Sequence, residues 1–232
     1  MSAAPAFAQV ETWVFDLDNT LYPPSSRLFE LIDARMGAFI SDLLGVDAPA
    51  ARAVQKDYYR RYGTTLRGLM EVHEVDPHRF LAYVHDVPRD RLTADPALGE
   101  AIANLPGRRF VLTNGSRSHA EECARALGLH HLFEDFFDIA AAEFVPKPAR
   151  RTYERFLERF AVDPRHAAMF EDLAGNLEAP HALGMTTVLV LPRGEDLSER
   201  QRRPDDALKG PHVDHATDDL TLFLSDIIAQ RG

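Results

Sequence analysis

Short apolar runs alternate with helical segments from about residue 95 onward, and this alternation allows few folds. Gly128 ends one helical segment at Ser118–Leu127, and other helices are expected near 95–107, 149–160, 174–183 and 220–229. Strands that alternate with helices are typical of a parallel sheet with right-handed crossovers. The runs that have the length of buried strands are RFVLT (109–113), residues 136–139, AAMFED (167–172) and TTVLVL (186–191), with a last strand expected at 213–216.

The first predicted strand, TWVFDL (12–17), is separated from the others by a stretch without any strand pattern. Within this stretch, residues 23–91, apolar residues recur three and four positions apart, and capping residues such as Asp47 precede the helical runs. We therefore predict an α/β fold: a three-layer α/β/α, Rossmann-like core with a parallel sheet, built from residues 1–22 and 92–232. The insert at 23–91 is predicted to be an α-helical cap domain.

Composition limits the functions that are open to such a chain. Its 232 residues carry a formal net charge of −10, which argues against a nucleic-acid binder with a basic surface. Cys123 is the single cysteine, so intrachain disulfides and thiolate metal clusters are excluded, and a reducing, cytoplasmic location is expected. No signal peptide is expected, and no window reaches the roughly 18 apolar residues of a membrane span. The polar stretch 193–212 is predicted to be a surface loop.

Polar side chains of several kinds follow the predicted strands at the points where these strands end. Ligands bind outside the carboxyl ends of parallel strands, so these side chains are expected to share one site. They are Asp16, Asp18, Asn19 and Thr20 after the first strand, Thr113, Asn114, Gly115 and Ser116 after the second, Lys147 after the third, and Glu171, Asp172 and Asn176 after the fourth. Each pattern alone also occurs in ordinary turns and helix caps. Their shared position favours a functional site.

This set of side chains meets the requirements of phosphoryl transfer. A carboxylate can approach a phosphate only if positive charge compensates the repulsion, and Mg²⁺ held by oxygen ligands supplies part of that charge. Lys147, Thr113 and the backbone amides near 114–116 are candidates to supply the rest. The sequence therefore predicts Mg²⁺ as the cofactor and a small phosphorylated metabolite as the partner.

The two aspartates of the first strand end need different tasks in such a reaction. One residue, Leu17, separates them. Both aspartates can therefore face the open side of the site while Leu17 points into the core. Asp16 is the predicted nucleophile, which stays ionised and binds the metal. Asp18 is the predicted acid and base, which gives a proton to the leaving oxygen and later takes one from the attacking water.

Four short motifs then carry a resemblance to a known family. DLDNT (16–20), LTNG (112–115), PKP (146–148) and ED with a later Asn (171–176) resemble the four motifs of the haloacid dehalogenase superfamily of phosphotransferases. The resemblance extends from about residue 12 to 191, and the helical insert is similar to the family's type-1 cap. Dehalogenases of this superfamily lack the second aspartate, so Asp18 favours a phosphatase or phosphomutase.

The resemblance also implies a role for individual residues. It assigns the nucleophile to Asp16 and the acid and base to Asp18. Mg²⁺ is then bound by the Asp16 side chain, the Asp18 backbone carbonyl and Asp172. The residues implied to contact the phosphoryl group are Thr113, Asn114 and Lys147, with Gly115 in the same loop.

Three longer segments are similar to the pyrimidine 5′-nucleotidase branch of that superfamily. They are VFDLDNTLYP (14–23), YYRRYGTTLRGLM (58–70) and FEDLAGNL (170–177). The similarity implies dephosphorylation of UMP-, CMP- or TMP-like monophosphates. In the cap, Arg67 and the tyrosines near it are candidates to contact the sugar or base, and a loop is expected at 63–65. Leu173 departs from the branch, where a serine is expected after the acidic pair.

The leading hypothesis is a Mg²⁺-dependent hydrolase of small phosphomonoesters, with a nucleotide as substrate and without a nucleic-acid or membrane partner. A monomer or a homodimer is expected. The alternative is a phosphatase or mutase of sugar phosphates or other small phosphorylated metabolites, because the cap rather than the core selects the substrate. A non-catalytic protein that binds metal and phosphate ranks behind both, since the full motif set is present.

Overall fold

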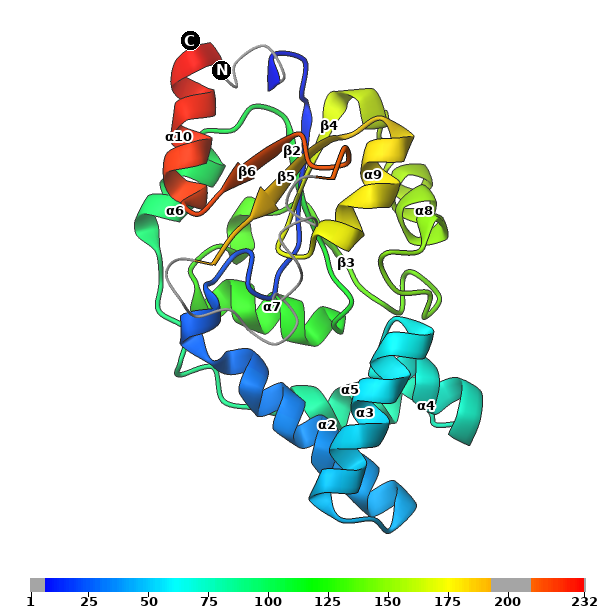
Figure 1. Ribbon diagram of the computed structural model, residues 1–232. Helices are drawn as coiled ribbons and strands as arrows, with labels where there is room; N and C mark the ends of the chain where they lie inside the picture. The colour runs from blue at the N-terminus through cyan, green and yellow to red at the C-terminus, as the bar shows by residue number, and fades with distance from the viewer. Residues whose placement is uncertain (1–6, 193–209, 232) are drawn as a thin grey trace.

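The computed structural model describes residues 7–192 and 210–231 of the chain. This part contains a parallel sheet of six strands in the order β3-β2-β1-β4-β5-β6 (Figure 1). The strands are β1 (Thr12–Phe15), β2 (Arg108–Leu112), β3 (Asp135–Phe137), β4 (Ala167–Glu171), β5 (Thr186–Val190) and β6 (His215–Thr217). The predicted α/β fold is confirmed. Most of the loop expected at 193–212 lies outside the described residues.

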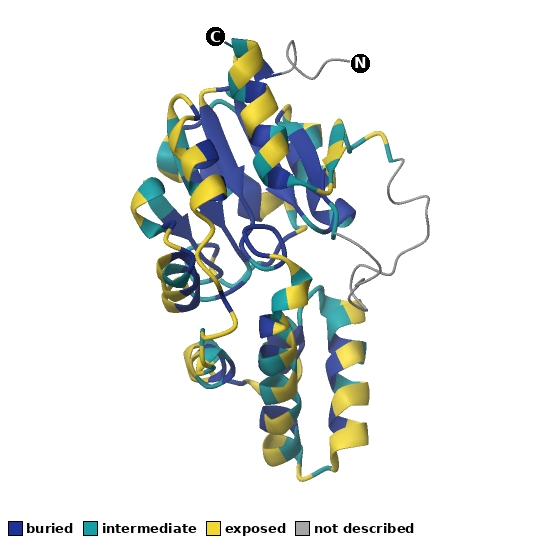
Figure 2. Ribbon diagram, turned by 90° about the vertical axis from the view of Figure 1, so that its left-hand side faces the viewer, coloured by how far each residue is buried: buried dark blue, intermediate teal, exposed yellow. Residues whose placement is uncertain are grey.

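Helices cover both faces of the sheet, because side chains of each strand point alternately to opposite faces. In β1, Trp13 and Phe15 pack into one apolar cluster and Val14 packs into another. Figure 2 shows these strands as a buried layer. The first cluster includes residues of α6 (Pro96–Ala103), α7 (Arg117–Ala126) and α10 (Leu220–Arg231), and the second includes residues of α8 (Arg150–Phe160) and α9 (Glu178–Leu183).

The insert after β1 is helical, as the sequence predicts. Its helices lie together at one end of the core (Figure 1). Its helices are α2 (Leu28–Leu44), α3 (Ala48–Tyr62), α4 (Thr65–His73) and α5 (Pro77–His85). They share a third apolar cluster, in which the rings of Phe39 and Phe80 meet edge to face with centroids 5.1 Å apart. The domain boundaries at 23 and 91 stay predictions. No helix in the described ranges is both long and apolar enough to cross a membrane.

The loop expected at 63–65 is shorter than predicted because Thr64 caps a helix. Its side chain accepts a hydrogen bond from the Arg67 backbone N–H at 3.1 Å, and α4 starts at the next residue. Tyr58 of α3 packs on Gly68 of α4, and its hydroxyl hydrogen-bonds His73 Nε2 at 2.6 Å. The run of tyrosines therefore belongs in part to the packing between α3 and α4.

Gly107 lies where the connection into β2 passes directly against the backbone of Glu11. Its φ is +87°, and an added Cβ would overlap the Glu11 carbonyl oxygen. We expect Gly107→Ala to lower the free energy of unfolding by about 3 kcal/mol, because left-handed strain and a backbone clash add together. Gly45 is the matched control. Its φ is +64° with nothing within 4 Å, so Gly45→Ala should cost only about 1 kcal/mol in urea unfolding. Equal losses for both variants would contradict the clash.

Candidate active site

The sheet brings the polar residues of several strand ends to one edge. β1 lies between β2 and β4 in parallel register, so Asp16, Thr113 and Glu171 leave the sheet side by side. The backbone N–H of Asp16 donates to the Phe170 carbonyl at 2.9 Å, and that of Thr113 donates to the Phe137 carbonyl at 3.0 Å. The pairing of the strands thus continues to the first residue of the site.

Lys147 reaches this edge from the loop between β3 and α8 and is 2% exposed. Its Nζ donates to Asp16 Oδ1 at 2.6 Å, to Glu171 Oε1 at 2.9 Å and to the Leu112 carbonyl at 3.0 Å. Asn114 fixes the backbone of this lysine: its Oδ1 accepts from the Lys147 N–H at 2.8 Å, and its Nδ2 donates to the Lys147 carbonyl at 3.2 Å. Asn114 therefore acts on the position of the lysine through the backbone.

The charges around this lysine are not fully compensated. Although burial lowers the pKa of Lys147, Asp16 and Glu171 hold it above its usual value, so the ammonium persists. Burial raises the pKa of Asp16, and Glu171 and Asp18 add to this effect, whereas Lys147 opposes it. Burial also raises the pKa of Glu171, but Lys147 and the Leu173 N–H lower it overall. One ammonium thus faces several carboxyl groups, and a further cation would be stabilised there.

A candidate metal site lies beside the lysine. Among the described residues, Asp16, Glu171 and Asp172 each offer a carboxylate oxygen, and these oxygens lie within 4.8 Å of one another. The predicted ligands Asp16 and Asp172 are thus brought together. Glu171 lies with them, and the contribution predicted for Asp18, its backbone carbonyl, stays a prediction. Carboxylate oxygens of this kind suit Mg²⁺, which prefers hard ligands.

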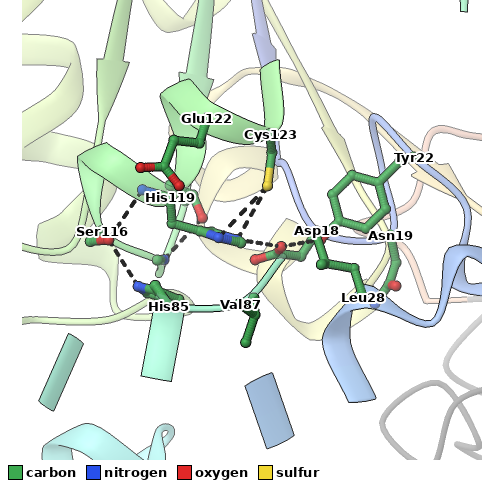
Figure 3. Close-up of polar contacts among 12 residues, drawn as sticks. Asp18, Asn19, Tyr22, Leu28, His85, Val87, Ser116, His119, Glu122 and Cys123 are labelled. Carbon is green, nitrogen blue, oxygen red and sulfur yellow. Dashed lines mark hydrogen bonds and ion pairs between the residues drawn. The ribbon is translucent and has the colours of Figure 1, made fainter. Parts of the chain in front are cut away.

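Asp18 points toward His119 of α7 (Figure 3). Its Oδ1 accepts from His119 Nε2 at 2.9 Å and from the Tyr22 hydroxyl. Burial raises the pKa of Asp18, but the neighbouring His119 and the hydrogen bonds from His119 and Tyr22 hold it well below its usual range. The two predicted catalytic aspartates therefore have different surroundings, and such a difference suits the separate tasks predicted for them.

A cavity of about 1310 Å³ lies between this edge of the core and the helical insert. Thr113 and Gly115 line it, and the Gly115 N–H donates to Thr113 Oγ1 at 3.0 Å. The other predicted residues on its wall are Asp16, Asp18, Asn19, Asn114, Lys147, Glu171, Asp172 and Asn176. The insert contributes, among others, Phe29, Met36, Arg52, Lys56, Tyr59, Arg60, Thr64 and Phe80.

Arg67 does not reach this cavity, so the structure does not support the prediction that it contacts a substrate there. Its guanidinium pairs with Glu71, one turn along α4. It lines a separate pocket of about 380 Å³ with Tyr62 and Pro146. The reason is the capped start of α4, which sets the direction of this side chain. Tyr59, from the preceding helix, is on the wall of the large cavity instead.

Sequence reasoning missed His119, Tyr22 and His85. His119 lies in the first turn of α7, three residues after its capping residue Ser116, and is fully buried. A histidine in the helix that follows a strand end with polar residues was the available signal. Tyr22 is four residues after Asp18. His85 ends α5 and stacks on His119 with ring centroids 4.4 Å apart.

The fold and the site together define a hydrolase-like α/β domain with a helical cap. The family model of the haloacid dehalogenase-like hydrolases matches residues 10–184, which include β1, the insert and β4. The chain therefore belongs to the haloacid dehalogenase-like hydrolase family.

Relatives of known name are similar over most of the chain. Enolase-phosphatase E1 of Frankia alni is 41% identical over 215 residues, covering 80% of this chain and 87% of that protein. Phosphate metabolism protein 8 of Saccharomyces cerevisiae is 27% identical over 197 residues. That match covers 78% of this chain but 61% of the yeast protein, which is less than two thirds of its length.

Solved structures share the fold at low identity. A HAD phosphatase from Thermococcus onnurineus superposes with a TM-score of 0.61 at 16% identity, covering 93% of this chain and 97% of that one. The L-2-haloacid dehalogenase from Xanthobacter autotrophicus, with chloropropionic acid covalently bound, gives a TM-score of 0.59 at 16% identity and the same coverage. At this identity the likeness shows the fold alone.

Proposed function

We propose that the chain is a phosphatase that hydrolyses small phosphomonoesters through an aspartyl-phosphate at Asp16. The observation that carries this proposal is the buried Lys147 ammonium, bonded at once to Asp16 and Glu171 beside Asp172 at the floor of a large cavity. Asp18 on the same wall favours phosphate esters over halides, because a phosphate ester needs a proton for its leaving oxygen. The relative named enolase-phosphatase supports the same class of reaction.

The proposed reaction has two displacements at phosphorus. A carboxylate oxygen of Asp16 bonds to phosphorus while the bond to the ester oxygen breaks, and Asp18 gives a proton to that oxygen. Water then attacks the phosphorus of the aspartyl-phosphate, Asp18 takes a proton from it, and Asp16 and inorganic phosphate are released. Asp18 is ionised before substrate arrives, so it takes up a proton from solvent as the phosphate dianion approaches and raises its pKa. It gives this proton to the leaving oxygen, and the carboxylate that results serves as the base of the second step.

The donor set fits a divalent cation. We propose that Asp16, Asp172 and the Asp18 backbone carbonyl hold Mg²⁺, with Glu171 beside them. When bound, Mg²⁺ supplies positive charge next to the phosphoryl oxygens. Thr113 and Lys147 are the proposed contacts of the phosphoryl group from the protein, with Gly115 beside them in the same loop. Asn114 supports them by holding the Lys147 backbone.

The leaving group is the finer part of the proposal. Tyr59, Arg60 and Thr64, from the cap segment that resembles the pyrimidine 5′-nucleotidase branch, lie on the cavity wall. We therefore propose pyrimidine nucleoside 5′-monophosphates as the first substrates to test. Sugar phosphates and other small phosphometabolites form the second arm of the panel, because the cavity of about 1310 Å³ accepts either size.

The test is phosphate release from p-nitrophenyl phosphate and this panel, compared by kcat/KM in a cytoplasm-like reducing buffer. A nucleotide preference supports the finer proposal, and a sugar-phosphate preference replaces it. Absence of release from every ester, together with measurable Mg²⁺ and phosphate binding, would instead indicate a non-catalytic binding protein.

Removal of the metal is expected to stop the reaction reversibly. With EDTA we expect turnover to fall by on the order of 10³-fold, because the carboxylates at the floor of the cavity would then repel the phosphate. Activity should return when Mg²⁺ is added in excess. The same titration with Ca²⁺ is the control, since Ca²⁺ prefers more ligands and a looser geometry. Full turnover in the chelated protein would contradict the proposed metal site.

A further inference from the structure

The acid and base proposed above, Asp18, is held through one of its two oxygens. His119 Nε2, at 2.9 Å, and the Tyr22 hydroxyl both bond Oδ1 (Figure 3). Among the described residues nothing bonds Oδ2. In that part of the chain, Arg89 Nε is the one side-chain nitrogen or oxygen that is fully buried and has no hydrogen-bond partner. Asp18 Oδ2 has no partner there either, so it is not fully buried. Because Asp18 lines the cavity, this oxygen is accessible.

Asp18 and Arg89 favour the same tautomer of His119. A carboxylate only accepts, so the contact of Nε2 with Asp18 Oδ1 needs a proton on Nε2. A terminal nitrogen of Arg89 lies 3.3 Å from Nδ1, and a guanidinium, which has only donors, favours an unprotonated Nδ1 beside it. Nε2 then donates to Asp18. The Cys123 thiol, 3.7 Å from the same Nδ1, is placed to donate as well.

The chain also holds Arg89 and His119 in place. The same nitrogen of Arg89 donates to the His85 carbonyl at 3.0 Å and to Glu122 Oε2 at 3.0 Å. The ring of His119 is fully buried, and His85 stacks on it at an interplanar angle of 12°. His85 in turn contacts Ser116 Oγ at 2.8 Å through Nδ1. These contacts leave the imidazole little freedom to rotate away from Asp18.

We propose that Arg89 and His119 form a positioning pair for the reaction: Arg89 packs its donors against Nδ1 and favours the tautomer with the proton on Nε2, and His119 holds Asp18 by Oδ1 so that Oδ2 faces the cavity. The inference rests on the proposed phosphatase function and assigns a task to residues outside the family-like motifs. Neither His119 nor Arg89 contacts the reacting atoms. Their effect on the rate passes through the orientation of Asp18.

Leaving groups distinguish this role from a merely structural one. An alkyl phosphate needs a proton on its leaving oxygen, whereas p-nitrophenolate leaves without one. His119→Phe keeps a buried ring but removes the donor. We expect it to lower kcat/KM by about 100-fold for an alkyl phosphate and by less than about tenfold for p-nitrophenyl phosphate. KM should change little, because substrate contacts remain.

Conservative and control variants complete the experiment. His119→Gln keeps an N–H donor and should recover most of the alkyl phosphate activity. Arg89→Met should show the same dependence on leaving group with a smaller loss, and it tests the pair even where His119→Phe fails to fold. His131→Ala changes an exposed histidine and should match the wild type. In an Asp18→Asn background, His119→Phe should cause no further loss.

The outcomes separate the two proposals. Absence of phosphate release by the wild-type protein from every ester overturns the proposed function. Release by the wild type, with equal losses for alkyl and aryl esters in folded His119 and Arg89 variants, overturns the positioning pair. A full additional loss in the Asp18→Asn background overturns it as well. Folding of each variant is measured by thermal unfolding.

Discussion

Asp16→Asn is expected to abolish the phosphatase activity, with kcat lower by on the order of 10⁴-fold or more. An amide is a far weaker nucleophile than a carboxylate, and it forms no stable phosphoryl intermediate. The change is nearly isosteric: the amide oxygen can accept from Lys147 Nζ, and the amide N–H can donate to the Thr20 hydroxyl, which bonds the other oxygen of Asp16 in the wild type. We therefore expect the folded protein to persist, and thermal unfolding checks this.

Two further aspartate variants make this result specific. Asp42→Asn alters an exposed carboxylate of α2 and should leave turnover unchanged. Asp172→Asn removes a proposed metal ligand, so it should raise the Mg²⁺ concentration needed for half-maximal rate and be rescued in part by excess Mg²⁺. Ordinary turnover in Asp16→Asn would remove Asp16 as the nucleophile and with it the aspartyl-phosphate mechanism.

Lys147→Met is expected to have the second largest effect, on stability as well as on rate. The variant leaves Asp16 and Glu171 buried and facing each other without the ammonium between them. Breaking a buried ion pair from one side costs about 3–5 kcal/mol, which we expect as the loss in free energy of unfolding. Turnover should fall by on the order of 10³-fold, because a positive charge proposed to meet the phosphoryl group is lost.

Urea unfolding at equilibrium measures the stability effect. Lys56→Met on α3 is the matched control for stability, since its side chain is exposed, and it should cost less than about 0.5 kcal/mol. Added Mg²⁺ should recover part of the stability of Lys147→Met, because the cation then neutralises the remaining carboxylates. Wild-type stability in the variant without metal would show that Lys147 does not hold this site together.

In the helical cap, the packing of the helices decides which side chains face the cavity, and the sequence pattern does not. The sequence predicts that Arg67 and the tyrosines near it contact the sugar or base of a substrate, and the structure places these residues differently. Tyr59 lies on the cavity wall, whereas Tyr58 packs on Gly68 and Arg67 pairs with Glu71. Tyr58 and Tyr59 differ because successive residues of a helix, here α3, point in directions about 100° apart. Arg67 belongs to the next helix, α4, which starts at Thr65. Closeness in the sequence to a residue of the cavity wall is therefore a weak guide to side-chain direction.

The site residues at the strand ends were predictable because the strands and their ends follow from local sequence patterns. Short apolar runs between helices imply a parallel sheet, and in such a sheet the residues after each strand meet at one edge. The topology alone places three of these residues next to one another. Asp16 follows β1, Thr113 follows β2, and Glu171 is the last residue of β4. Lys147 could be assigned to the same edge because it lies between the third strand and the next helix.

The sequence by itself thus determined the α/β fold, the helical insert and the kind of chemistry at the strand ends, because each depends on periodicity and on residue type. The tertiary structure decided which side chains meet. The hydrogen bond between Asp18 and His119 joins residues 101 positions apart, and that between Lys147 and Asp16 spans 131. No local pattern encodes such pairs, since they arise only when helices and loops pack against the finished sheet. For that reason Asp18 was recognisable from the sequence, but the residues that orient it were not.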